Sequence, residues 1–136
     1  MKKWIPYILA ALLLLPTALG AQNRPSRENI VRYNAERMAG SLSLEGKTRA
    51  DFVSLYSEFY SEMMGLRSEL RRRPDTKPEN DREIEERILA DFEMSRKILD
   101  LRESYFQKFR TILPAAKILQ MYQLEKQHAE KHHDSD

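Results

Sequence analysis

Three side chains near the C-terminus have the types and spacing of metal ligands. Glu125, His128 and His132 follow at intervals of three and four residues, which places them on one face of a helix. Two imidazoles and a carboxylate suit a divalent zinc, copper or nickel ion. Terminal residues are seldom held in place, however, so the same group also fits a polar tail that binds no metal. The sequence predicts at most a weak site here.

Catalytic chemistry has little support in the rest of the chain. An enzyme needs a nucleophile, a tuned acid or base, or a metal held by converging ligands. This chain has no cysteine and only four glycines, none of them in a phosphate-binding loop, and its three histidines all lie close to the C-terminus. We therefore expect a protein that is not an enzyme and that carries no resident cofactor.

A stripe of aromatic and methionine side chains is the main candidate for binding another protein. It consists of Phe52, Tyr56, Phe59, Tyr60, Met63 and Met64. Such side chains adapt to varied apolar partners, but at helical spacing they also form cores. A small helical unit cannot bury two wide apolar faces completely, so we expect part of the apolar surface on the second and third helices to serve a client or a dimer partner. Charged substitutions at Tyr56 or Tyr60 should then stop client binding if those side chains face outward.

Four arginines close the same predicted helix, namely Arg67, Arg71, Arg72 and Arg73. They could dock acidic segments of a client or of a sensor protein. They also lie where the negative end of the helix dipole favours positive charge, and where acids beyond Asn80 can pair with them. Exposed ion pairs contribute about 0–1 kcal/mol, so the structural interpretation is the simpler one.

The spacing of apolar residues predicts an all-α fold with four helices. The first runs from Arg27 to Ser41 after an N-cap at Ser26, and the second covers about 48–73. A loop with two prolines separates the second helix from a long third helix, which opens with acids. Pro114 suits the first turn of a fourth helix that ends near 131. Two long helices joined by a short loop predict an antiparallel αα-hairpin.

The first 21 residues have the layout of a secretory signal peptide. Two lysines precede an apolar run that ends at Leu15, and the small residues Ala18 and Gly20 suit a signal peptidase. The apolar run is shorter than the roughly 20 residues that span a bilayer. We expect export to the periplasm and cleavage, which leaves residues 22–136 as one helical domain with a flexible tail from about 128. A retained anchor is the alternative.

The charge balance argues against nucleic acid as a partner. The chain has 23 basic and 21 acidic residues, and removal of Lys2 and Lys3 with the signal leaves 21 of each. Binding to nucleic acid by counterion release needs clustered excess lysine and arginine. We expect protein partners instead, and no stable membrane insertion after cleavage.

Two short segments resemble the degenerate Leu-Thr-x-x-Gln motif of the periplasmic Spy/CpxP family. They start at Leu44 and Leu113, each just before a predicted helix. Glu45 and Pro114 stand where the family has threonine, and Thr48 and Lys117 stand where it has glutamine. The order of elements is also similar to the family, with a signal peptide, four helices and a long hairpin. This resemblance covers nearly the whole mature chain.

The resemblance implies a homodimer of curved hairpins that forms a cradle and binds unfolded or stressed polypeptides without ATP. Other members of the family sense envelope stress or metal ions. The expected function is therefore that of a periplasmic chaperone, or of an adaptor that contacts an envelope sensor protein. The alternative is a metal-responsive sensor or scavenger that uses the C-terminal histidines.

Overall fold

The computed structural model describes residues 24–133, which form an all-helical fold as the sequence predicts. The predicted signal peptide lies outside the described residues. Four helices follow one another along the chain: α1 (Arg27–Ser41), α2 (Gly46–Arg71), α3 (Asp81–Phe109) and α4 (Ala115–His133). None of these four helices is both long and apolar enough to cross a bilayer.

Side-chain caps explain where two of the helices begin. The Ser26 hydroxyl accepts a hydrogen bond from the backbone N–H of Asn29 at 3.2 Å, and the Asn80 side chain accepts one from the N–H of Glu83 at 3.0 Å. Each cap satisfies a donor that the first helical turn leaves unpaired. The Ser26 cap is the one that the sequence predicts for α1, whereas for α3 the sequence predicts only an acidic helix start, and the Asn80 cap is found in the structure.

The other boundaries differ from the sequence prediction by about one or two residues. Helix α2 begins at Gly46 and ends at Arg71, two residues earlier at each end than predicted. Ser43 and Gly46 have φ angles of 55° and 60°, and this left-handed backbone turns the chain between α1 and α2. Helix α4 continues to His133, and the predicted mobility of the chain from about 128 stays a prediction.

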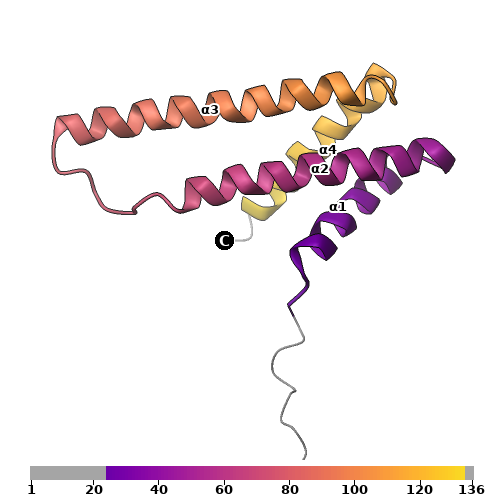
Figure 1. Cartoon of the computed structure of the whole chain (residues 1–136), viewed down its shortest axis with the longest axis horizontal. Helices are drawn as coiled ribbons and strands as arrows, with labels where there is room; N and C mark the ends of the chain where they lie inside the picture. The colour runs from indigo at the N-terminus through magenta and orange to yellow at the C-terminus, as the bar shows by residue number, and fades with distance from the viewer. Residues whose placement is uncertain (1–23, 134–136) are drawn as a thin grey trace, which may run out of the picture.

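Helices α2 and α3 run side by side in opposite directions (Figure 1). Three polar contacts between the helices fix their register. In these contacts residue numbers rise along α2 as they fall along α3, which shows that the helices are antiparallel. The contacts are Glu62–Tyr105 at 2.7 Å, Glu69–Lys97 at 2.9 Å and Arg73–Asp91 at 2.5 Å.

The core lies at the end of this helix pair that is distant from the α2–α3 loop, where α1 and α4 pack against it (Figure 1). Aromatic rings fill its centre, with centroids 5.7 Å apart for Phe52 and Phe109 and 5.3 Å apart for Phe59 and Tyr105. Both leucines that open the motif-like segments, Leu44 and Leu113, are buried there. Because apolar burial drives folding, this end holds most of the stability.

The loop end of the helix pair has almost no core of its own. Met63 is the last buried residue of α2, and Met94 is the first buried residue of α3. The two helices extend past α1 and α4 at this end (Figure 1).

Candidate functional site

A groove of about 530 Å³ opens where α1, α2 and α4 meet, with Arg102 of α3 at its edge. We call it the arginine groove, because Arg37, Arg67 and Arg102 all line it. It brings together residues from all three groups that the sequence singled out. From α2 these are Tyr56, Phe59, Tyr60, Met63, Met64 and Arg67, and from α4 they are Glu125, His128 and His132.

Glu125 is the one carboxylate in the lining of the arginine groove. Its side chain is only 17% exposed, accepts a hydrogen bond of 3.1 Å from the Tyr56 hydroxyl, and lies 3.6 Å from the Arg102 guanidinium. Burial raises the pKa of Glu125, while Tyr56, Arg102 and Arg67 oppose that shift. Burial and the nearby Glu125 also raise the pKa of Tyr56, so its hydroxyl stays protonated and keeps donating.

His128 lies on the same helix face and contacts α1. The guanidinium of Arg37 donates to its Nδ1 at 3.2 Å, so this nitrogen accepts and the imidazole is neutral. Burial lowers the pKa of His128, and the positive charge of Arg37 acts in the same direction. The contact therefore ties α4 to α1 most firmly at neutral and higher pH.

The predicted metal ligands are not brought together by this arrangement. Residues 24–133 contain no group of three histidine, aspartate or glutamate side chains placed to hold one ion. Glu125 turns toward Tyr56 and Arg102, whereas His128 turns toward Arg37. The spacing puts Glu125, His128 and His132 on one helix face, but partners from other helices separate them.

Most of the aromatic and methionine stripe belongs to the core. Phe52, Tyr56, Phe59 and Met63 are buried within the single chain, so they offer no surface for a client. Only Tyr60 and Met64 are half-buried, and both face the arginine groove. The physical reason is that α1 and α4 cover this face of α2. The condition for the substitution test at Tyr56 is therefore not met.

The four arginines of α2 do not act as one cluster. Arg73 joins α2 to α3 by donating to the Asp91 carboxylate at 2.5 Å and to the Ala90 carbonyl at 2.7 Å. The backbone N–H of Arg72 caps α2, while Arg67 lines the groove. The side chain of Arg71 is exposed. The structural interpretation is therefore supported by side-chain contacts for Arg73.

An exposed apolar row on α3 is a feature whose residues the sequence analysis does not single out as a site. It comprises Ile84, Ile88, Phe92 and Leu99, which are 42–55% exposed, and we call it the α3 outer row. The intervals of four, four and seven place these residues on one helix face. The pattern is visible in the sequence, where it is naturally assigned to the core.

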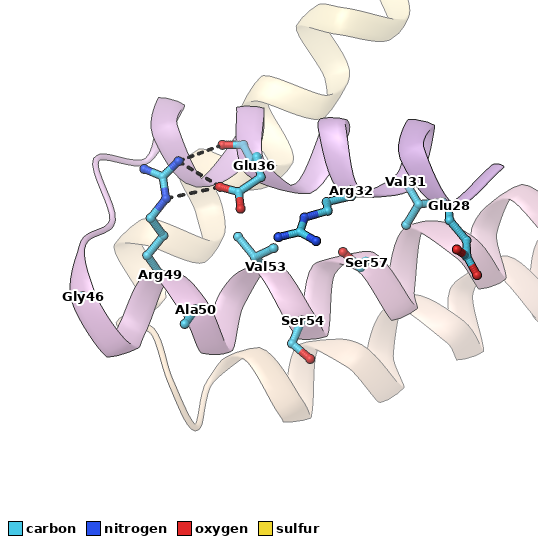
Figure 2. Close-up of a pocket in the computed structure, with 10 residues that line it drawn as sticks. All are labelled: Glu28, Val31, Arg32, Glu36, Gly46, Arg49, Ala50, Val53, Ser54 and Ser57. Atoms are coloured by element: carbon cyan, nitrogen blue, oxygen red, sulfur yellow. Dashed lines mark hydrogen bonds and ion pairs between the residues drawn. The ribbon is translucent and has the colours of Figure 1, made fainter. Parts of the chain in front are cut away.

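A second hollow, of about 580 Å³, lies between α1 and α2. Figure 2 shows Arg49 of α2 reaching across one end of it to Glu36 of α1, with Val53 and Arg32 inside. Arg49 donates to the Glu36 carboxylate at 3.0 and 3.3 Å, so this pair already neutralises its own charges. This hollow is less suited to recognising a charged partner than the arginine groove.

Comparisons with known proteins do not identify a family for this chain, so its function has to be inferred from its geometry. No family model, curated protein or solved structure matches it.

Replacing Glu125 with glutamine should change how stability depends on pH. Because the pKa of Glu125 is raised on folding, its favourable contribution is lost as the pH rises through the folded-state pKa. Glutamine still accepts the Tyr56 hydrogen bond and has no charge to desolvate. Glu125→Gln should therefore have the higher free energy of unfolding near neutral pH, and the two proteins should converge below about pH 4.

Urea unfolding followed by circular dichroism at several pH values would check this. The partly exposed Arg102 loses little by losing its partner. A variant that is less stable than the wild type near neutral pH would show that the ion pair outweighs burial.

Proposed function

We propose that this chain is a periplasmic chaperone of the Spy/CpxP type that acts without ATP, or an adaptor of the same type that contacts an envelope sensor. It binds polypeptides rather than catalysing a reaction. The observation that carries the proposal is the α3 outer row, because large apolar side chains grouped on one exposed face are typical of surfaces that bind other proteins.

The size of the row suits transient binding. If a client covers the exposed half of its four side chains, apolar burial contributes about 3–6 kcal/mol before the costs of association. A gain of that size does not exceed the usual cost of association of about 4–15 kcal/mol by itself, so further contacts around the row must contribute and the complex stays weak. A client held in this way can leave and fold without an energy source.

Charged residues surround the row and limit what it attracts. Arg87, Asp91, Glu93 and Arg96 are exposed on α3 between its apolar positions. Both signs are present, so the rim favours no single charge on the client. It also disfavours stacking of one chaperone on another through the row.

The Spy/CpxP assignment and the homodimer are part of the proposal. The order of the four helices supports them, as does the burial of Leu44 and Leu113 at the two motif-like segments. Lys117 replaces the glutamine of the second motif and still ties α4 to the core, since its Nζ donates to the Leu42 carbonyl at 2.7 Å. The metal-responsive alternative has weaker support, because Glu125 and His128 are engaged with other side chains.

Light scattering from a chemically denatured test protein, diluted into buffer without ATP, tests the proposal. Scattering should fall when the chain is present at an equal molar ratio, and zinc should make no difference. Suppression that appears only with zinc would favour the metal-responsive alternative. Scattering that is unchanged under both conditions would contradict the chaperone function.

A further inference from the structure

The arginine groove carries an excess of positive charge that the chain as a whole does not have. Each of the four helices contributes one cation to its lining: Arg37, Arg67, Arg102 and Lys126. Glu125 is the single acid among the lining residues, so four positive charges face one negative charge. Basic and acidic side chains balance in residues 22–136, so the excess is local.

Most of this charge is not neutralised by neighbouring side chains. Glu125 is shared, because it lies 3.6 Å from Arg102 and also interacts with the charge of Arg67. Arg37 contacts a neutral imidazole nitrogen that brings no negative charge. Arg67 and Lys126 make no hydrogen bond or ion pair within residues 24–133. Cations gathered in a concave surface focus their field and favour an anion there.

Part of the groove lining is apolar and aromatic. Tyr60, Met64 and Tyr122 are half-buried lining residues, and Tyr56 and Met63 are buried ones. Aromatic rings and thioethers fit flat or branched apolar groups. A volume of about 530 Å³ is also typical of sites for small ligands.

We infer that the arginine groove binds a carboxylate attached to an aromatic or branched apolar group. In this proposal the apolar group contacts Tyr60, Met64 and Tyr122, and the carboxylate lies toward Arg67 and Lys126. A free aryl-alkanoic acid has this chemistry, and so does the C-terminal residue of a peptide. The inference does not depend on the chaperone function, because the groove shares no residue with the α3 outer row.

Isothermal titration calorimetry with N-acetylphenylalanine tests the inference, with the uncharged amide of the same compound as the matched ligand. The carboxylate should bind, and the amide should bind about tenfold more weakly or worse, because the charge-assisted contacts are lost. Arg67→Gln should weaken binding of the carboxylate by about tenfold. Lys126→Gln, which also replaces an exposed cation, should weaken binding of the carboxylate as well.

Arg71→Gln is the matched control, since Arg71 lies one turn further along α2, is exposed and does not line the groove. It should bind N-acetylphenylalanine like the wild type. Equal affinity for acid and amide, or an equal loss in Arg71→Gln and Arg67→Gln, would each overturn the inference. Absence of binding would also overturn it if neither N-acetylphenylalanine nor a free-acid peptide ending in phenylalanine binds.

A peptide ending in phenylalanine, compared with its C-terminally amidated form, separates the two sources of the carboxylate. Binding of both N-acetylphenylalanine and the free-acid peptide would support a site for small acids in general. Binding of the free-acid peptide alone would support a site for polypeptide C-termini. Loss of peptide binding on amidation is required in either case.

Discussion

Glutamate in place of both Ile88 and Phe92 should abolish suppression of aggregation and leave the protein folded. The two side chains form the middle of the α3 outer row, about one helical turn apart. A client that contacts the row would have to desolvate both carboxylates, which costs more than the apolar contacts return. Glutamate is a good helix former, and both positions are exposed, so helicity and the midpoint of thermal unfolding should stay near those of the wild type.

Leu119→Glu is the control for this double variant. Leu119 is 58% exposed and lies on α4, away from the α3 outer row. Light scattering should show full suppression with Leu119→Glu and none with the double variant, and circular dichroism should show equal helix content. Full suppression by the Ile88→Glu, Phe92→Glu protein would remove the row from the mechanism.

Phe109→Ala should cause the largest loss of stability of any single substitution considered for this chain. The Phe109 side chain is 1% exposed, and its ring contacts those of Phe52, Tyr56, Phe59 and Tyr105 at centroid distances of 5.7–6.4 Å. Truncation of a phenylalanine in such a core costs about 3–5 kcal/mol, because apolar burial is lost and a cavity remains. That is a large part of the about 5–15 kcal/mol that stabilises a typical domain.

Urea unfolding of Phe109→Ala and of Tyr33→Ala would measure this difference. Tyr33 is exposed on α1, so its truncation should change the free energy of unfolding by about 0.5 kcal/mol or less. A loss below about 1 kcal/mol for Phe109→Ala would show that the aromatic cluster relaxes around the cavity and does not govern stability.

The elements of this fold are predictable from local sequence patterns. Ser26 and Asn80 are N-cap residues that mark helix starts without reference to the rest of the chain. The apolar periods of the helices and the prolines of the α2–α3 loop are equally local.

The assignment of faces is not predictable in the same way. Helices α2 and α3 each carry an apolar surface wider than one neighbour can cover, and local spacing does not say where α1 and α4 will pack. The structure covers the face that contains Phe52 and Tyr56, and it leaves Ile88 and Phe92 open. The residues that the sequence singles out for binding therefore lie mostly in the core, whereas the exposed apolar row lies on α3.

The proposed metal ligands illustrate the same limit. Their spacing is a local property of α4, and it does place the three side chains on one face of that helix. Their partners come from distant segments: Tyr56 precedes Glu125 by 69 residues, and Arg37 precedes His128 by 91. These long-range contacts decide that Glu125 and His128 hold helices together within the described part of the chain.

The most direct test of the central claim is a binding titration of a fluorescently labelled, permanently unfolded polypeptide, followed by fluorescence anisotropy without ATP. Wild-type protein and Leu119→Glu should raise the anisotropy along the same curve, while the Ile88→Glu, Phe92→Glu protein should leave it at the value of the free polypeptide. A wild-type chain that leaves the anisotropy unchanged, or a double variant that binds as the wild type does, would contradict the claim that this protein holds unfolded chains on the α3 outer row.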